Sequence, residues 1–316
     1  MRHLLALLLA LTFAGALAQP YPSRPIRIVA PFPASGGVDL SARVIGQKLS
    51  ERFGTSVVID NRPGAGGILG TDIVAKAPAD GYSLLLNGSS HWIGPFVEKV
   101  SYDPVADFAA VSLVDRTPVI LVVHPSLPVG SVKQLVALAK ARPGQLNFSS
   151  GAPGSSNYIG GMLFNHYAKV DIVRIPYKGS AQGLTALMSG ETQVMFASPG
   201  VVTSQLKSER LRALAVGSAQ RSELARGLPT IAESGIPGYV CETLHAVFAP
   251  AGTPAAVVTR LHQEIDRFLK SADGKSQFLK GGVEAASSTP QQLTATMKSE
   301  MATIGKILKA AGVTPP

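Results

Sequence analysis

Small polar residues follow two extended segments of this sequence at the points where helical patterns begin. The segment 26–29 leads into a Ser-Gly-Gly turn at 35–37, and the segment 146–150 leads into a Ser-Ser-Asn turn at 155–157. The first backbone N–H groups of a helix carry partial positive charge and lack partners inside the helix, so such turns bind anions. Two further serines follow the apolar segment 83–88. The residues predicted to donate hydrogen bonds to a ligand carboxylate are Ser35, Gly36, Gly37, Ser89, Ser90, Ser155, Ser156 and Asn157.

Three further residues near these turns have both a structural and a ligand-binding interpretation. Asp39 either stabilises the N-terminus of its own helix, which we favour, or contacts a ligand hydroxyl or ammonium group. Lys178 either pairs with a second acidic group on the ligand or is an exposed lysine. Tyr177 either stacks on the ligand or packs against the protein.

The sequence lacks the motifs of catalytic, nucleotide-binding and metal sites. No Gly-Lys-Ser/Thr follows the first turn, the glycine-rich stretch 64–70 is one residue too long for a dinucleotide fingerprint, and no G-x-S-x-G elbow occurs. The histidines show no metal-ligand spacing. We interpret His91 as a structural histidine, Cys241 as a small buried residue and 64–70 as a tight loop entering a helix. We therefore predict no catalytic residue, no metal and no cofactor.

The N-terminal segment and the composition indicate an exported protein. Residues 1–18 have a short basic start, an apolar stretch and an Ala-Leu-Ala cleavage signal, which is typical of a secretory signal peptide. The single cysteine excludes an intramolecular disulfide. The formal charge of +9 is scattered along the chain with few aromatic residues nearby, so no nucleic-acid partner is predicted. We expect a periplasmic protein, monomeric and without a membrane anchor.

Apolar β-branched segments alternate with amphipathic helical windows along the chain. This alternation predicts βαβ units, mostly parallel sheets and an α/β fold. In the third of four expected helices, Thr253 is the predicted N-cap and Pro254 the first helical residue. The expected helices are 40–54, 131–144, 253–269 and 289–308.

Two long extended stretches, 117–128 and 239–254, are interpreted as crossings between two domains. Domain 1 is then discontinuous, with residues 19–118 and 245–316, and domain 2 comprises 119–244. Two crossing strands form a hinge that lets a cleft close on a ligand. The two anion-binding turns then lie one in each domain, at the carboxyl ends of strands, where α/β sheets bind ligands.

Seven ordered motifs resemble the Bug family, the periplasmic solute receptors of tripartite tricarboxylate transporters. The motifs are APFPASGGVDLSAR, VVIDNRPGAGGILG, PADGYSLLL, IPYKGSAQGLTALMSGETQVMF, LRALAV, LPTIAESGIPGY and FAPAGTP, and the resemblance covers nearly all of the mature chain. It implies a two-domain periplasmic binding protein (Venus flytrap) fold, no enzymatic activity, a small organic acid as ligand and membrane permease subunits as partners. By matching position, it implies that the ligand is bound by Phe32, Ala34, Ser35, Gly36, Asp39, Ser155, Ser156, Asn157, Tyr177 and Ser198.

The sequence departs from the family pattern at three positions. Tyr158 and Met162 stand where the family often has a His and a Glu, and Leu244 stands where it often has a Trp. Tyr158 and Leu244 suggest a more apolar pocket, suited to an aromatic or aliphatic acid.

The predicted function is capture of a small organic acid in the cleft and its delivery to a tripartite tricarboxylate-type membrane transporter. A sensor that presents its ligand to a signalling partner is an alternative that the sequence leaves open. A secreted α/β hydrolase is a more distant alternative, because it needs a nucleophile with a base in reach and no such motif occurs.

Overall fold

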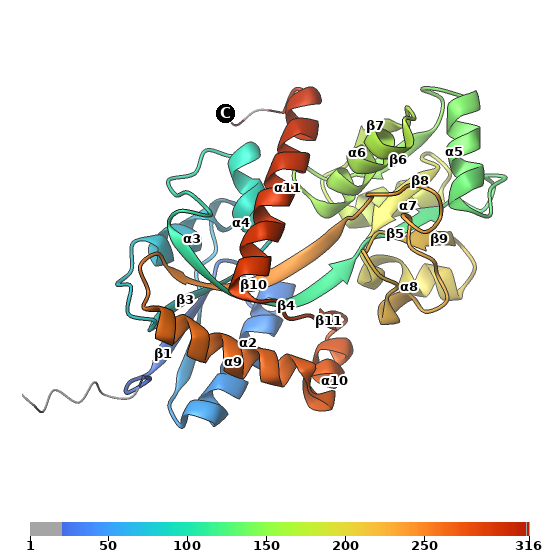
Figure 1. Ribbon diagram of the computed structural model, residues 1–316. Coiled ribbons are helices and arrows are strands. Elements are labelled where there is room, and N and C mark those ends of the chain that lie inside the picture. The colour runs from blue at the N-terminus through green and yellow to red at the C-terminus, as the bar shows by residue number, and fades with distance from the viewer. Residues whose placement is uncertain (1–20, 314, 316) are drawn as a thin grey trace, which may run out of the picture.

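The computed structural model describes residues 21–313 and 315, which form two α/β halves, each built around one β-sheet (Figure 1). The predicted signal peptide, residues 1–18, lies outside the described residues. Among the residues that are described, no helix combines the length and the hydropathy that a membrane span requires.

The first sheet has six strands in the order β11-β4-β10-β3-β1-β2. Their bounds are β1 (Ile26–Ala30), β2 (Val57–Asn61), β3 (Ser83–Gly88), β4 (Phe108–Pro118), β10 (Glu242–Pro250) and β11 (Glu284–Ala285). β1 pairs in parallel with β2 and β3, whereas β10 is antiparallel to both β3 and β4. Side chains on both faces of β1 are buried, including Ile28 and Val29, as expected for a strand covered on both sides.

The second sheet has five strands in the order β7-β6-β8-β5-β9. Their bounds are β5 (Ile120–Val123), β6 (Asn147–Ser150), β7 (Val173–Pro176), β8 (Val194–Ala197) and β9 (Arg212–Val216). β6 is parallel to β7 and β8, and β5 is antiparallel to β8 and β9. The predicted α/β fold with mostly parallel strands is confirmed. β5 and β10 are antiparallel to their neighbours, and they are the strands through which the chain enters the other half.

Helices cover both sheets. Those of the first half are α2 (Gly37–Phe53), α3 (Ile68–Ala75), α4 (Ser90–Ile93), α9 (Ala255–Lys270), α10 (Ala272–Lys280) and α11 (Pro290–Ala310). Those of the second half are α5 (Val132–Ala141), α6 (Ser156–Ala168), α7 (Ser180–Met188) and α8 (Pro199–Lys207). Short 3-10 helices are η1 (Ala65–Gly67), η2 (Gly94–Phe96) and η3 (Glu223–Ala225).

The start of α9 differs from the prediction by one residue. Pro254 is the N-cap and the helix begins at Ala255. The Thr253 hydroxyl donates to the Pro250 carbonyl at 2.8 Å, so Thr253 belongs to the preceding turn and does not cap the helix.

The two connections between the halves lie side by side. β4 leads through Val119 into β5, and the segment 217–241 returns from β9 to β10. The Gly217 N–H donates to the Val119 carbonyl at 2.7 Å, and the Cys241 N–H donates to the Gly217 carbonyl at 2.8 Å. β10, the first strand after this return, begins at Glu242.

α11 packs against both halves (Figure 1). It contacts β4 and α4 of the first half and α6 of the second. A capping box fixes its start: the Thr289 hydroxyl accepts the Gln292 N–H, and the Gln292 side chain accepts the Thr289 N–H. Met297 and Ile304 belong to the same buried apolar cluster as Leu163 of α6. The C-terminal helix therefore forms a wall shared by the two halves.

Candidate ligand-binding site

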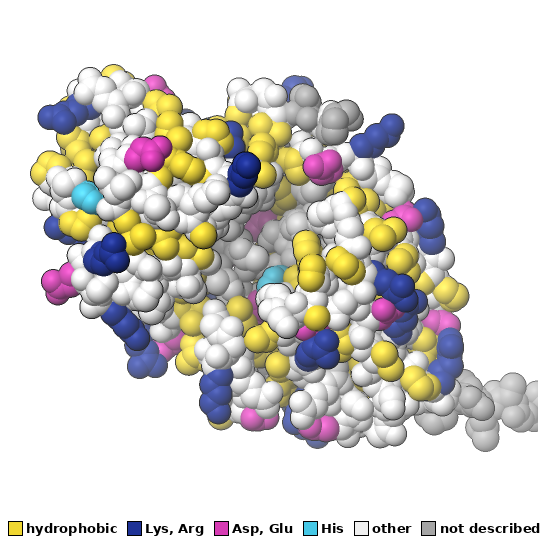
Figure 2. Space-filling model, turned by 180° about the vertical axis from the view of Figure 1, so that it is seen from behind, with side chains coloured by type: hydrophobic (Ala, Val, Ile, Leu, Met, Phe, Trp, Pro, Cys, Tyr) yellow, Lys and Arg dark blue, Asp and Glu magenta, His cyan; other side chains and the backbone are white. Residues whose placement is uncertain are grey.

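A cavity of about 1080 Å³ opens between the two halves. Figure 2 shows the molecule hollowed there, with histidine and acidic side chains visible in the hollow. Its walls come from the loop into α2, the start of α4, the start of α6, β10 with the residues before it, and α11. Residues of both halves therefore line the cavity, as expected from an anion-binding turn in each half.

The first predicted turn lies on this cavity. Ser35, Gly36 and Gly37 all line it, and Gly36 is the N-cap of α2. Within the described part of the chain, no side chain caps this helix. The backbone N–H groups of the first turn of α2 are therefore available to an anion in the cavity.

Asp39 holds the first turn in place. Its carboxylate accepts hydrogen bonds from the Ser35 backbone N–H (2.9 Å), Arg43 Nε (2.9 Å) and Asn61 Nδ2 (3.0 Å). Burial by itself raises the pKa of Asp39, but these hydrogen bonds and the Arg43 charge outweigh burial and lower the pKa. Asp39 is buried and does not line the cavity. The structure supports its structural role at the start of α2, and a ligand contact of Asp39 stays a prediction.

The second predicted turn meets the cavity through Ser156, the first residue of α6. The Ser155 hydroxyl lies 2.6 Å from both the Ala152 carbonyl and Asn157 Oδ1, and Asn157 Oδ1 also accepts the Gly151 N–H at 3.2 Å. These side chains are used to close their own loop. Neither Ser155 nor Asn157 lines the cavity, and in this structure both side chains position the loop.

Three residues predicted for the second half lie away from the cavity. Tyr177 and Lys178 follow β7, the edge strand of the second sheet, whereas the cavity faces the loop after the inner strand β6. The Tyr177 hydroxyl donates to Glu191 Oε1 at 2.8 Å, and Lys178 is exposed. Ser198 is the N-cap of α8. The structure does not bring these three residues to the site.

Three other predicted residues lie on the cavity. Phe32 and Ala34 come from the loop before α2, and Ser89 precedes α4. The Ser89 hydroxyl accepts the backbone N–H of Leu244 at 3.2 Å, which ties the start of α4 to β10. A hydroxyl that accepts one hydrogen bond retains its own proton as a donor, so Ser89 can also donate to a ligand.

Apart from Phe32, the apolar wall of the cavity is built from residues that the family resemblance did not indicate. Tyr158 and Leu244 are buried in the protein core and do not line the cavity, so they do not make the pocket apolar. Ile159 and Leu163 follow Ser156 at helical spacing, and one face of α6 therefore combines an anion-binding end with an apolar flank. The apolar lining comprises Phe32, Ile93, Ile159, Leu163, Val240 and Ile304.

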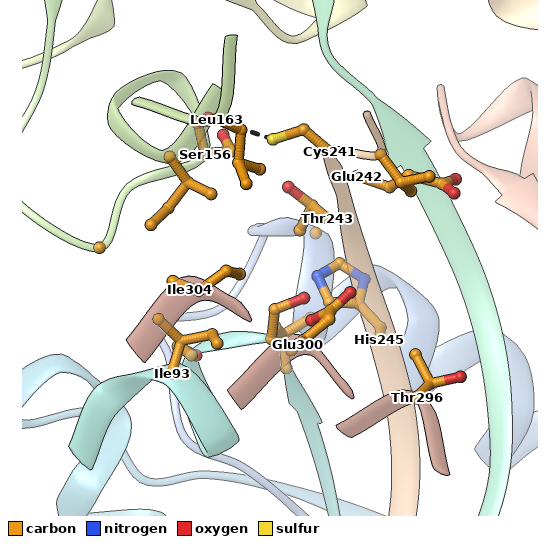
Figure 3. Close-up of a pocket in the computed structure, with 18 of the residues that line it drawn as sticks. Ile93, Ser156, Leu163, Cys241, Glu242, Thr243, His245, Thr296, Glu300 and Ile304 are labelled. Atoms are coloured by element: carbon orange, nitrogen blue, oxygen red, sulfur yellow. Dashed lines mark hydrogen bonds between the residues drawn. The ribbon is translucent and has the colours of Figure 1, made fainter. Parts of the chain in front are cut away.

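Three titratable side chains on the cavity are not among the predicted site residues: Glu242, His245 and Glu300 (Figure 3). Glu300 Oε2 accepts the Trp92 indole N–H at 2.7 Å. Burial raises the pKa of Glu300 to about 7, and burial also raises the pKa of Glu242. Strand alternation is the signal that could have placed His245, because it shares a strand face with Cys241, another lining residue.

His91 and the stretch 64–70, both interpreted as structural from the sequence, lie away from the cavity. His91 is fully buried, with Nε2 3.1 Å from the Pro104 carbonyl and its ring stacked on Tyr102. Burial lowers the pKa of His91 to about 3. The stretch 64–70 forms η1 and the start of α3, away from the cavity.

Cys241 is buried, and burial raises the pKa of its thiol, so the reactive thiolate is disfavoured. Its Sγ lies 3.6 Å from the Ser156 carbonyl oxygen. Within residues 21–313 and 315, no cluster of three or more His, Cys, Asp or Glu side chains is arranged to hold a metal ion.

Comparison with known proteins agrees with the resemblance of the sequence motifs. The family described as "Tripartite tricarboxylate transporter family receptor" (TctC) matches residues 41–313. BugT of Bordetella pertussis strain Tohama I is 35% identical over 95% of this chain and 93% of its own length. Rpa4515 of R. palustris, solved with adipate, is 36% identical with a TM-score of 0.73, over 94% of this chain and 100% of that one. The periplasmic binding protein BugD is 30% identical with a TM-score of 0.69, over 94% and 100%. The chain thus belongs to the TctC (Bug) family of periplasmic solute receptors that serve tripartite tricarboxylate transporters.

Proposed function

We propose that this protein binds a small organic acid in the cavity between its halves and delivers it to the membrane subunits of a tripartite transporter. One observation carries the proposal. The N-termini of α2 and α6 belong to different halves of the protein, and both lie on the same cavity. Each helix end favours a nearby anion by roughly 0.3–1 kcal/mol, or ~2 when partly buried. Each hydrogen bond to a charged group adds about 1.5–3 kcal/mol. A micromolar affinity, about −8 kcal/mol, follows from a few such contacts.

The ligand class is supported by a solved relative. Rpa4515, at 36% identity, was solved with adipate, a linear dicarboxylate. The cavity of this chain offers backbone and hydroxyl donors at the starts of α2 and α6 and an apolar flank along α6. This combination fits an acid with a carboxylate at one end and a hydrocarbon part.

We propose that the ligand closes the two halves onto each other about the paired connections. Val119, Gly217 and Cys241 join the connections by hydrogen bonds, and each half has its own sheet, which supports domain 1 at 19–118 plus 245–316 and domain 2 at 119–244. The mature chain would act in the periplasm as a monomer, after removal of residues 1–18. A ligand that contacts both halves favours closure by its difference in affinity for the closed and open states.

A thermal-shift screen tests the proposed ligand class. The mature chain is unfolded and refolded to remove co-purified ligand and then heated with mono-, di- and tricarboxylates, aromatic acids and acidic amino acids. The matching amides serve as controls. A ligand at about 100 times its Kd stabilises the fold by about 2.7 kcal/mol, which raises Tm by several degrees. If no acid raises Tm more than its amide does, the carboxylate proposal fails.

A pair of charge substitutions tests the location of the site. Ser156→Glu adds a carboxylate on the cavity at the first residue of α6, where the helix end itself tolerates an acid. Repulsion between two carboxylates at about 4 Å is worth ~4 kcal/mol near a protein surface, so affinity should fall at least about 100-fold. Ser180→Glu makes the same change at the first residue of α7, which is exposed and away from the cavity, and should leave affinity unchanged. Equal affinity in both variants would move the site elsewhere.

A further inference from the structure

We infer that His245 is a specificity-determining residue of this cavity, and that its Nε2–H donates a hydrogen bond to the ligand's carboxylate beside the start of α2. The inference rests on the proposed function, because it requires an acid in the cavity. His245 lines the cavity from β10, and its side chain is 8% exposed. Figure 3 shows its ring among the labelled side chains that surround the cavity, with Thr243 and Glu300 nearby in the view.

The ring of His245 lies in a slot that glycine makes possible. A Cβ on Gly37 would lie 3.2 Å from Cε1 and 3.8 Å from Nε2 of the ring. A Cβ on Gly88 would lie 3.0 Å from Cδ2 and 3.5 Å from Nε2. Gly37 is the first residue of α2, and both glycines line the cavity. Nε2 is therefore held next to the anion-binding turn at 35–37, where it and the helix N–H groups can reach the same carboxylate.

Asp115 of β4 fixes the orientation of the ring. Its Oδ1 lies 2.8 Å from Nδ1 of His245, and its Oδ2 accepts the Ser41 hydroxyl at 2.5 Å. Asp115 is fully buried, and its charge next to Nδ1 favours a proton on that nitrogen. A neutral ring then presents the lone pair of Nε2 to the cavity, whereas a protonated ring presents an N–H. Only the protonated ring can donate to a carboxylate, so the acid binds together with a proton.

The charge of Asp115 acts on this proton, and two further acidic side chains lie on the same cavity. Burial lowers the pKa of His245, but the charge of the nearby Asp115 carboxylate outweighs burial and raises the pKa. Glu300 of α11 and Glu242 of β10 also line the cavity, while α2 and β3 bring Gly37 and Gly88 to the ring. Glu300 also loses its proton near neutral pH, and its negative charge would then repel an acid. Deprotonation of either His245 or Glu300 weakens acid binding as the pH rises, so the test must separate them.

Isothermal titration calorimetry of the mature wild-type chain and its H245Q and E300Q variants separates these groups. The probes are adipate, malate, citrate and benzoate, titrated between about pH 6 and pH 9 in two buffers of different ionisation enthalpy, which reports proton uptake. For a probe that binds, wild-type affinity should fall by up to about tenfold per pH unit above the pKa of His245, with uptake of a proton. E300Q should keep this uptake. H245Q should bind at least about tenfold more weakly at the lower pH and show a flatter profile.

The D115N variant provides a positioning test. Without the Asp115 charge, the pKa of His245 falls, so the loss of affinity should begin at a lower pH than in the wild type. A merely structural role of Asp115 would lower the affinity equally at every pH.

The outcomes distinguish the inference from the proposed function. If the wild type binds an acid and H245Q binds it with the same affinity and pH profile, the inference is wrong and the proposed function stands. If none of the acids binds the wild type, both are wrong. If H245Q does not fold, proton uptake that persists in the E242Q/E300Q double variant supports the inference, and its absence there overturns it.

Discussion

At the scale of single residues, the surroundings of two buried histidines give them opposite properties. His91 lies in an aromatic cluster with Tyr102, Phe108 and Phe248, where burial lowers its pKa to about 3. His245 is also largely buried, although it lines the cavity, and the carboxylate of Asp115 raises its pKa. The first histidine is therefore a neutral packing residue, and the second is a cation donor at the cavity. Histidine follows its neighbours in this way because its unperturbed pKa lies close to neutral pH.

Acid should weaken the fold through His91. The folded chain keeps His91 neutral down to about pH 3, whereas the unfolded chain protonates it below about pH 6.5. Stability from this residue is present above pH ~6.5 and decreases as the pH falls, because the unfolded state then binds the extra proton. In urea denaturation, the stability advantage of the wild type over H91Q should shrink by about 1 kcal/mol per pH unit between about pH 6 and pH 4.

The control for this measurement is H166Q, at a histidine exposed on α6 whose ring is in contact with water in both states. As a substitution at an exposed position, H166Q should change stability by less than about 0.5 kcal/mol. A difference for H91Q that stays constant with pH would show that His91 is not kept neutral by the fold.

At the scale of elements, helix starts determine where the site lies. α2 begins at a glycine N-cap and is fixed from behind by Asp39, so its first N–H groups remain available. The N-cap of α6 is Ser155, whose hydroxyl is used inside its own loop. α11 differs, because Thr289 and Gln292 satisfy its first N–H groups. α2 and α6, whose N-termini have no side-chain cap among the described residues, meet the cavity at those ends, whereas α11 meets it along its side, through residues such as Glu300.

Removing the cap of α11 should destabilise the fold. Thr289→Ala loses the hydroxyl that accepts the Gln292 N–H, and such losses cost about 1 kcal/mol. Thr259→Ala, at an exposed position inside α9, removes the same atoms without a cap and should change stability by less than about 0.5 kcal/mol. Chemical denaturation of both variants measures the difference. Equal effects would mean that the cap adds nothing to the stability of the helix.

At the scale of the whole molecule, the two halves are joined by backbone contacts around one glycine. A Cβ on Gly217 would lie 2.6 Å from Val119 Cγ2 and 2.8 Å from the Cys241 carbonyl oxygen. A second contact bridges the halves, because Glu284 of β11 accepts the Ser222 hydroxyl at 2.9 Å from the segment after β9. The connections are thus closely packed.

Adding a methyl group at the connection should therefore affect the whole molecule. Gly217→Ala forces Val119 or Cys241 to shift, and overpacking of this kind costs about 1–3 kcal/mol. Gly200→Ala, in α8 with no atom within 4 Å of the added Cβ, should instead be neutral or stabilising. Thermal unfolding tests stability, and small-angle X-ray scattering with and without a bound acid tests closure. Unchanged stability of G217A would show that Val119 and Cys241 can move to accommodate the methyl group without loss of stability.

Local sequence patterns determined the elements and the broad function. β-branched segments and amphipathic windows identify the two-sheet fold, because the side chains that face the core must repeat with the period of the element. The turns at 35–37 and 155–157 identify helix starts, since glycine and serine are favoured there. The ordered motifs predicted the receptor family, which the family match confirmed.

Only the tertiary structure decided which side chains reach the cavity. Ser155, Asn157 and Asp39 have the right chemistry, but hydrogen bonds within their own loops occupy them. His245 and Glu300 come from β10 and α11, far from both turns in the sequence, and they meet the turns only after the sheets assemble. Their protonation depends on the burial and the neighbouring charges that long-range packing creates, and no local pattern encodes these.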